Sequence, residues 1–262
     1  MDLELVGKIA LVTGSYRGTG NAIASGLIQE GATVIVHGFE EELTRVAAEK
    51  IEAPHFIIGD ITTDAGAKHV AEQVLSIVGG LDILVNNYGT GAGGLWETAS
   101  SSDWVDIYQK NVLSAMRMIQ LFLPKLKESK NGRIIQLGTI GSTKPNSKMP
   151  HYYSSKGALA NMTVSLAKEL THTGITVNTV SPGLIRTDEL EAAYREKAKR
   201  KNWGETWAEI EAAIVANDFP NPVGRIARRE DIANLVAFLC SSAAGYINGQ
   251  NIGVDGGALG IV

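Results

Sequence analysis

Residues 8–20 read KIALVTGSYRGTG, a short apolar run that leads at once into a turn with three glycines. The run is rich in strand formers, and residues 21–30 have the apolar spacing of a helix. A buried strand that enters a helix through such a turn gathers backbone N–H groups at the helix N-terminus, which suits a pyrophosphate. Side chains at Gly14, Gly18 and Gly20 would obstruct the turn, the phosphates or the packing of helix on strand. The G-x-x-x-G-x-G spacing by itself leaves open a tight turn that binds no ligand.

Length and composition limit the possible classes of protein. The chain has 262 residues, 44% hydrophobic and 20% charged, which is enough for one large domain with a full core. Its net charge of −4 gives no electrostatic case for nucleic acid as a partner. The single cysteine, Cys240, excludes an internal disulfide framework and fits a reducing compartment. The acidic first five residues do not resemble a signal peptide, and no apolar run could span a bilayer. We therefore expect a cytoplasmic protein without a membrane partner.

Apolar runs of strand length alternate with amphipathic stretches of helical length along the chain. The expected strands are residues 8–12, 33–37, 55–60, 81–87, 132–138, 175–180 and 251–254. The expected helices are residues 21–30, 41–51, 65–78, 104–127, 152–171, 189–201 and 232–242. This alternation is typical of a doubly wound parallel sheet with helices on both faces, a Rossmann fold, in a single α/β domain over residues 1–262.

Candidate site residues gather where the expected strands end. They are Gly14 to Gly20, Asp60, Asn86 to Gly89, Thr139, and Pro182 to Thr187. In open parallel sheets, ligands bind at the carboxyl ends of the strands. The sequence therefore predicts one binding site along that edge of the sheet.

Residues 152–156 read YYSSK and contain Y-x-x-x-K at the start of an expected helix, which places Tyr152 and Lys156 on one face. With the glycine turn, NNYG at 86–89 and Asn111, this pair resembles the short-chain dehydrogenase/reductase family, in particular its 3-oxoacyl reductase-like members. The resemblance continues through SPG at 181–183, Thr187, GR at 224–225, ED at 230–231, GQ at 249–250 and VDGG at 254–257. It covers nearly the whole chain.

The resemblance implies an oxidoreductase that interconverts a ketone and a secondary alcohol by hydride transfer with a nicotinamide cofactor. It assigns Tyr152 as the acid/base, Lys156 as its partner and Asn111 as the anchor of a proton-relay water. A free phenol has a pKa of about 10. A nearby ammonium and the positive nicotinamide ring would favour the phenolate and lower that pKa. Tyr153, one residue out of register, is expected to be packing or pocket wall, and His151 a polar neighbour at the helix start.

Two positions depart from the family's pattern. The family's serine thirteen residues before its tyrosine is Thr139 here, which keeps the hydroxyl donor but restricts rotamers and space. Ser142 is the rival and is expected to be a turn residue. The family's Asn-Asn-Ala-Gly has Tyr88 in place of alanine. Tyr88 either crowds or stacks at the mouth of the cofactor or substrate site, or packs on the loop 90–94.

The end of the second expected strand bears on cofactor choice. Members that use NAD usually carry an acid there, where this chain has Gly38. Arg17 matches a basic position of NADP-using members and could meet a 2′-phosphate, although it could also be a solvated turn residue, and Glu40 to Glu42 count against a phosphate. NADP(H) is therefore favoured over NAD(H). The expected cofactor-binding residues are Gly14, Ser15, Arg17, Gly18, Thr19, Gly20, Gly38, Asp60, Ile61, Asn87, Gly89, Tyr152, Lys156, Pro182, Gly183, Ile185 and Thr187, and no metal site is expected.

Residues 188–222 correspond to the family's substrate-covering lid. Trp207, Ile210 and Ile214 fall on one helical stripe, which suits either a core or a mobile apolar lid over a largely apolar substrate. The substrate is expected to be a small carbonyl or alcohol, its identity left open. A basic cluster at 195–201 could contact an anionic substrate or an acyl carrier protein, but interspersed acids favour a solvated face.

The helices expected at 104–127 and 152–171 carry apolar residues on more than one face, which predicts a homo-oligomer, a tetramer if the family resemblance holds. The alternative function is a non-catalytic dinucleotide-binding regulator or scaffold on the same fold. The set of Asn111, Thr139, Tyr152 and Lys156 argues against that alternative, because a binding module does not need it.

Overall fold

The computed structural model describes residues 2–91, 93–129 and 131–260, so Met1 of the acidic start and residue 92 of the loop after Tyr88 lie outside the described residues. Within these ranges, seven strands form one sheet in the order β3-β2-β1-β4-β5-β6-β7, and every neighbouring pair is parallel. The strands are β1 Ile9–Val12, β2 Thr33–Gly38, β3 His55–Ile58, β4 Ile83–Asn86, β5 Arg133–Leu137, β6 Thr176–Pro182 and β7 Asn251–Val254. The strand order changes direction between β1 and β4. The predicted single doubly wound domain is confirmed.

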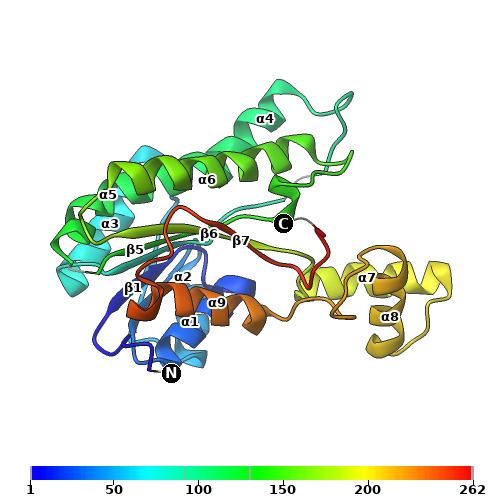
Figure 1. Ribbon diagram of the computed structural model, residues 1–262, viewed down its shortest axis with the longest axis horizontal. Coiled ribbons are helices and arrows are strands. Elements are labelled where there is room, and N and C mark those ends of the chain that lie inside the picture. The colour runs from blue at the N-terminus through cyan, green and yellow to red at the C-terminus, as the bar shows by residue number, and fades with distance from the viewer. Residues whose placement is uncertain (1, 92, 130, 261–262) are drawn as a thin grey trace.

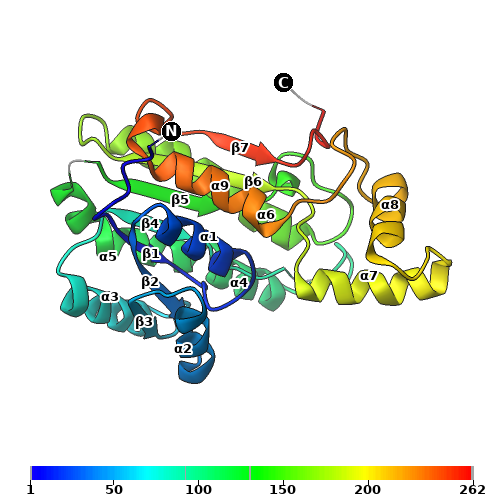
Figure 2. The same cartoon turned by 90° about the horizontal axis from the view of Figure 1, so that it is seen from below.

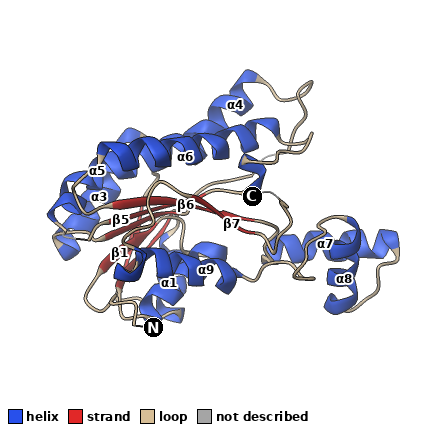
Figure 3. Ribbon diagram, in the orientation of Figure 1, coloured by secondary structure: helices blue, strands red, loops and turns tan. Residues whose placement is uncertain are grey.

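Helices cover both faces of this sheet (Figure 1; Figure 3). They are α1 Gly18–Gln29, α2 Glu41–Lys50, α3 Asp64–Val78, α4 Ser101–Tyr108, α5 Ser114–Glu128, α6 Pro150–Glu169, α7 Asp188–Lys201, α8 Trp207–Asn217 and α9 Arg229–Cys240. Helices α1 and α9 pack on one face, and α3, α5 and α6 pack on the other. Both faces of the central strands are therefore buried, which is why those strands read as continuous apolar runs.

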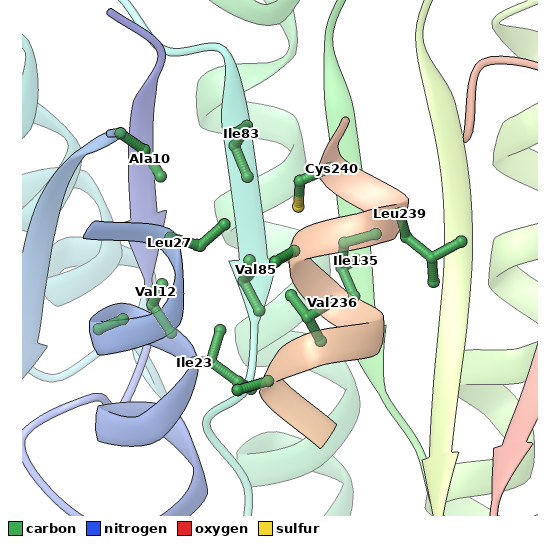
Figure 4. Close-up of a cluster of buried hydrophobic side chains, with 14 of the residues drawn as sticks. Ala10, Val12, Ile23, Leu27, Ile83, Val85, Ile135, Val236, Leu239 and Cys240 are labelled. Atoms are coloured by element: carbon green, nitrogen blue, oxygen red, sulfur yellow. The ribbon is translucent and has the colours of Figure 1, made fainter. Parts of the chain in front are cut away.

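The core divides along the sheet because neighbouring residues of a strand point to opposite faces. Val12 and Val85 belong to the cluster under α1 and α9, whereas Leu11 and Leu84 belong to the cluster under α3 and α5. Figure 4 shows the first cluster, where Leu27 of α1 and Val236 of α9 lie over the strands. Cys240 lies in this cluster as a buried, free thiol.

The predicted helix 104–127 is interrupted. Helix α4 ends at Tyr108, a π-helical segment runs through Gln109–Leu113, and α5 begins at Ser114. Asn111 therefore lies in the π-helical segment and not in the middle of a regular helix. Wide turns of this kind recur at functional sites because they re-aim a side chain, and local apolar periodicity does not reveal them. At the carboxyl end, β6 extends to Pro182, two residues beyond the predicted strand, because residues 181 and 182 still pair with β7.

Helices α7 and α8 project from one end of the body, as Figures 1 and 2 show. They have a small apolar core of their own, made of Ala198, Ile210, Ile214 and Ile226 with Leu184, Leu190, Tyr194, Trp203, Trp207 and Phe219 against them. The predicted stripe of Trp207, Ile210 and Ile214 thus packs inside this unit. Across the described ranges, no helix has both the length and the apolar character needed to cross a membrane.

Candidate active site

The glycine turn joins β1 to α1 at the carboxyl edge of the sheet. Gly14 and Gly18 have φ of 62° and 60°, the left-handed region that glycine adopts without steric cost. A Cβ on Gly20 would lie 2.7 Å from Gly14 O and would also collide with Asn87 Nδ2. Asn87 in turn donates from Nδ2 to Thr13 O (2.9 Å) and Gly14 O (3.2 Å), which ties the turn to the end of β4. The turn is therefore held in one shape before any ligand arrives.

Two buried polar residues support the turn from below. His37, at the end of β2, accepts from Gly14 N–H at Nδ1 (3.0 Å) and donates from Nε2 to Gly59 O (3.0 Å). Burial lowers the pKa of His37 to about 4, so the ring is neutral and keeps its acceptor. Ser15 donates to Val12 O (2.7 Å) and accepts from His37 N–H (3.0 Å). The Ser15 hydroxyl, expected to meet the cofactor, is thus fully buried beneath the turn.

His37 is a functional residue that the sequence reasoning missed. One feature of the sequence could have indicated it. His37 is a polar residue at the end of the apolar strand 33–37, and the predicted sheet places the end of that strand beside the glycine turn. A lone histidine in that place gives no indication of its partner, because Gly14 is 23 residues away.

A groove of about 410 Å³ runs past this turn. It is lined by Gly14, Tyr16, Arg17, Gly18, Thr19, Gly20, Phe39, Asn87, Tyr88, Gly89, Thr90, Thr187 and Glu189. The glycines leave room for close approach, and exposed backbone at the start of α1 faces the groove. These are the features that a dinucleotide pyrophosphate requires. The groove therefore fits a nicotinamide dinucleotide.

Tyr88 lines the groove with its aromatic ring. Its centroid lies 4.9 Å from that of Phe39, and the two rings are tilted by 48°. Burial raises the pKa of Tyr88 to about 12, so the phenol stays neutral. The sequence left two roles open for Tyr88, and its position in the groove lining agrees with the role at the mouth of the cofactor site.

Among the expected cofactor positions that lie outside the groove lining, Gly38 ends strand β2, and Asp60 and Ile61 follow strand β3. A Cβ on Gly38 would overlap Thr44 Oγ1, so no acidic side chain could occupy that position. Ile61 is 1% exposed and its side chain packs in the core. Asp60 is exposed, and its carboxylate accepts from Thr62 N–H (2.9 Å) and the Thr62 hydroxyl (2.6 Å).

Asn111, Lys156 and Gly89 converge behind the groove. Asn111 donates from Nδ2 to Thr90 O (3.0 Å) and to Ser155 Oγ (2.9 Å), and Oδ1 accepts from Thr90 N–H (2.7 Å). Lys156 Nζ donates to Leu137 O (2.7 Å). A Cβ on Gly89 would lie 2.8 Å from Asn111 Oδ1 and 3.0 Å from Lys156 Nζ, so only glycine fits between them.

Ser155 is a second missed residue. It is fully buried, and its hydroxyl donates to Tyr152 O (2.7 Å) while it accepts from Asn111. It therefore connects the π-helical segment to the first turn of α6, which carries Tyr152. Ser155 lies inside the Y-x-x-x-K motif, where small residues are common, so no pattern in the sequence indicated that it connects these two segments.

Burial dominates the pKa values of the Tyr–Lys pair. It lowers the pKa of Lys156 to about 8. It also raises the pKa of Tyr152 to about 12, with the nearby Tyr153 adding to the rise and a hydrogen bond with Thr139 opposing it. The expected lowering by a lysine ammonium is therefore wrong for this structure. The ammonium is itself poorly solvated and is directed to Leu137 O, so burial of the phenol outweighs it.

Thr139 and Ser142 are separated by the turn after β5. Thr139 lines a cavity of about 510 Å³ between this turn and helix α7, and its hydroxyl bonds Tyr152. Ser142 is the last residue of the 3₁₀ turn Ile140–Ser142 and donates to Thr139 O (2.7 Å). The Thr139 hydroxyl, and not that of Ser142, is the one beside Tyr152.

The neighbours of Tyr152 have different surroundings. The Tyr153 ring lies where a Cβ on Gly141 would be, lines the same cavity as Thr139, and accepts from Asn146 Nδ2 (2.9 Å). His151 is 1% exposed and lies 6.0 Å from the Trp104 ring, and within the described residues neither ring nitrogen has a hydrogen-bond partner.

The end of β6 connects the sheet to α7. Pro182 is buried, and Gly183 N–H donates to Val254 O (3.0 Å). Ile185 pairs with Ala227 in an isolated bridge, and Thr187 caps α7 by accepting from Leu190 N–H (3.2 Å). This segment therefore fixes where α7 begins.

Arg17 and Glu189 form an ion pair at 2.7 Å across the edge of the groove. Arg17, expected to face a phosphate, thus faces the first turn of α7 in this structure. Both side chains are largely exposed, so the ion pair contributes about 0–1 kcal/mol.

Comparison with known proteins gives one family. The family model described as enoyl-(acyl carrier protein) reductase matches residues 14–258. A 3-oxoacyl-[acyl-carrier-protein] reductase of Aquifex aeolicus is 34% identical over 262 residues, covering 98% of this chain and 99% of that protein. The L-sorbose reductase of Gluconobacter frateurii, solved with NADPH and L-sorbose, has a TM-score of 0.93 at 32% identity and covers 100% of both chains.

A 7α-hydroxysteroid dehydrogenase solved with NADH and 7-oxo glycochenodeoxycholic acid has a TM-score of 0.86 at 30% identity, covering 98% of this chain and 96% of that chain. These three relatives are named for an acyl thioester, a sugar and a steroid, so membership fixes the reaction and not the substrate. The two solved structures share the fold of this chain over nearly its whole length. The chain belongs to the short-chain dehydrogenase/reductase family and is an oxidoreductase that interconverts a ketone and a secondary alcohol with a nicotinamide cofactor.

Proposed function

We propose that this enzyme uses NADP(H) and that Tyr152 is its acid/base, assisted by Lys156, Asn111 and Thr139. The observation that carries the proposal is the meeting of four chain segments at one point. The π-helical segment, the turn after β5, the first turn of α6 and the end of β4 bring these side chains together beside the dinucleotide groove.

A nicotinamide held in the groove beside Tyr152 would supply the hydride to the carbonyl carbon, or accept it in the reverse direction. In reduction, Thr139 donates a hydrogen bond to the substrate oxygen, on which negative charge grows. Tyr152 gives its phenolic proton to that oxygen, so the C=O π bond is replaced by one C–H and one O–H bond. In oxidation the Tyr152 phenolate takes the proton of the alcohol.

The raised pKa of Tyr152 describes the resting phenol, which is the form that reduction needs. The phenolate left after proton transfer is stabilised by the Lys156 ammonium on the same helical face. With a pKa of about 8, Lys156 can also release a proton near neutral pH. Asn111 bonds the Thr90 backbone and the Ser155 hydroxyl, and Ser155 in turn bonds the Tyr152 carbonyl, so Asn111 supports the helical turn that carries Tyr152.

The preference for NADP(H) rests on two features. There is no room for a carboxylate at Gly38, so a ribose 2′-hydroxyl would find no acceptor there. Arg17 lies at the rim of the groove and is free enough to exchange Glu189 for a phosphate. The L-sorbose reductase binds NADPH, which supports this choice, whereas the steroid dehydrogenase binds NADH. Measurement of kcat/KM for NADPH and for NADH tests this preference, and a higher value for NADH would contradict the proposal.

We further propose that residues 188–222 form a lid over the substrate and that the protein is a cytoplasmic homotetramer. The lid packs in one small core with Leu184 and Ile226, which flank it, and ion pairs of its exposed acids Asp188 and Glu189 join it to the body, so it can move as a unit. The outer face of α5 and α6 has a groove of about 250 Å³ with Met116, Leu123, Met162 and Leu166 in its lining. Burying such a face is the usual reason for association. Light scattering that gives a monomer at micromolar concentration would contradict the tetramer.

The experiment that tests the function is a reductase assay with NADPH on a panel of ketones, beside a binding titration of the cofactor. We expect both binding and turnover, with turnover lost in Tyr152→Phe. Cofactor binding without turnover on any carbonyl compound would favour the regulator or scaffold instead.

A further inference from the structure

The cavity of about 510 Å³ that contains Thr139 is walled by three parts of the chain. The loop after β5 and α6 form one wall, the lid forms the second, and the C-terminal segment closes the third. Apolar residues, including Ile140, Leu184 and Phe219, supply part of the lining. Besides Thr139, the polar residues of the lining are Lys144, Asn146, Tyr153, Tyr194 and Asp218.

On the first wall, Asn146 and Tyr153 act as a pair. Asn146 Nδ2 donates to the Tyr153 hydroxyl (2.9 Å), and Asn146 Oδ1 accepts from Lys148 N–H (2.8 Å). Both ends of the Asn146 amide are thus oriented. The Tyr153 hydroxyl acts as an acceptor in this bond and still carries its own hydrogen, which it can donate into the cavity.

On the lid wall, Tyr194 and Asp218 form the opposing pair. Burial and the Asp218 carboxylate raise the pKa of Tyr194, and the Lys197 ammonium, which pairs with Asp218, lies 5.5 Å from the Tyr194 ring centroid. The same ammonium lies 4.9 Å from the Trp203 ring centroid. A carboxylate has about four acceptor sites, so Asp218 keeps acceptors for a ligand after this pairing.

We infer that the substrate is a polyhydroxylated ketone, or the sugar alcohol that corresponds to it. The inference rests on the proposed ketone–alcohol chemistry at Tyr152. Each hydroxyl of such a substrate can both donate and accept a hydrogen bond. In the cavity, Tyr153 offers a donor to them and Asp218 offers acceptors. A fatty acyl chain would remove water from these groups and give no hydrogen bond in return, which disfavours its binding.

Lys144 allows an anionic polyhydroxylated substrate to be distinguished from a neutral one. It stands in the cavity lining on the exposed loop after β5. A keto sugar acid has a carboxylate that Lys144 could pair with, whereas a neutral ketose has none. The Lys144→Met variant should therefore raise KM for an anionic substrate and leave a neutral one unchanged.

The test is a comparison of kcat/KM at saturating NADPH over five probes. These are D-fructose and L-sorbose, 5-keto-D-gluconate, acetoacetyl-CoA as a 3-oxoacyl thioester, and butane-2,3-dione as a small ketone without hydroxyls. The oxidation of the matching polyols with NADP⁺ covers the reverse direction. We expect one of the polyhydroxylated probes to exceed acetoacetyl-CoA and the dione by about a hundredfold or more, as for sites built to pair with hydroxyls.

Substitutions in the cavity test which side chains cause the preference for polyhydroxylated probes. The double variant Tyr153→Phe/Tyr194→Phe keeps both rings and removes both hydroxyls. It should raise KM for the best polyhydroxylated probe by about tenfold or more, with kcat and the dione constants within about threefold of wild type. Tyr246→Phe, at a fully exposed tyrosine, is the matched control and should change nothing.

The inference is overturned if acetoacetyl-CoA is the best probe, if the dione is reduced and no polyhydroxylated probe exceeds it, or if the double variant lowers all probes equally. Failure of the proposed function has a different signature: no probe, including the dione, is turned over in either direction although NADPH binds.

Discussion

The sheet edge and the lid are built in different ways. At the edge, Asn111 is fully buried, and both it and Lys156 are bonded to backbone carbonyls supplied by the loop after β4 and by strand β5. The lid at 188–222 is tied to the body by ion pairs whose acidic partners are exposed, such as Arg17–Glu189 and Asp188–Arg229 at 2.8 Å. Moving an edge group means breaking buried hydrogen bonds, whereas moving the lid breaks contacts that water replaces readily. Chemistry is therefore assigned to the edge, and recognition of the substrate to the lid.

This difference makes a general prediction about kinetics. Substitutions at the edge should lower kcat, because the groups there act on the reacting atoms. Substitutions on the lid should act on KM, because lid contacts form with parts of the substrate that do not react. Of the following four experiments, three test this separation by kinetics and one tests the stability of the edge. They run from the largest expected effect to the smallest.

The strongest test is Tyr152→Phe, which removes the proton donor and keeps the ring. We expect kcat to fall by roughly 10²–10⁴-fold, the contribution of general acid–base catalysis, while NADPH affinity in a fluorescence titration is retained. Tyr153→Phe is the control, since Tyr153 lines the cavity and faces Asn146. It should keep most of kcat. Equal losses in both variants would contradict the assignment of Tyr152.

Thr139→Ala should come next. It removes a hydroxyl that bonds Tyr152 and faces the substrate cavity, and loss of such a donor costs roughly 3–4 kcal/mol, or about a hundredfold or more in kcat. Thr139→Ser should stay active because the donor remains. Ser142→Ala should do little, because Ser142 donates to Thr139 O within the turn. If Ser142→Ala proved the crippling change, the catalytic hydroxyl would have to be reassigned.

His37 makes the rigidity of the edge depend on pH. Its pKa falls from 6.5 to about 4 on burial, so the folded state binds this proton more weakly than the unfolded state. Stability from the neutral ring is therefore complete above about pH 6.5 and is lost as the pH falls toward 4, by about 3 kcal/mol in all.

The measurement is the free energy of unfolding by urea at pH 7 and at pH 4.5. In His37→Asn, whose side chain can still accept from Gly14 N–H, this contribution to the pH difference should disappear. His172→Asn is the matched control at an exposed histidine with φ of 65°, which asparagine tolerates, and should leave the difference as in wild type. A pH difference that is the same in both variants would contradict the role of His37.

The smallest effect is expected on the lid side. Glu189→Gln should release Arg17 from its exposed ion pair, worth about 0–1 kcal/mol, and so raise kcat/KM for NADPH by up to about fivefold without a change for NADH. Arg17→Ala should lower kcat/KM selectively for NADPH. Parallel changes for both cofactors would show that Arg17 does not meet the 2′-phosphate.

The sequence by itself determined what depends on local pattern. Continuous apolar runs such as residues 81–87 predicted strands buried on both faces, and β4 lies there because helices cover both sides of it. Tyr152 and Lys156 were placed on one helical face because residues four apart in a helix are neighbours. Gly14 and Gly18 were expected to allow the turn, and both have a positive φ.

Only the tertiary structure decided which distant residues meet. His37 beneath Gly14, Ser155 beside Asn111 and Glu189 opposite Arg17 are separated by 23, 44 and 172 positions, and periodicity carries no trace of such pairs. The direction of the Tyr152 pKa was also missed, because burial is a property of the packed molecule and outweighs the single charge that the motif suggested. Local pattern specifies elements and their faces, whereas the environment of a side chain comes from every element that packs around it.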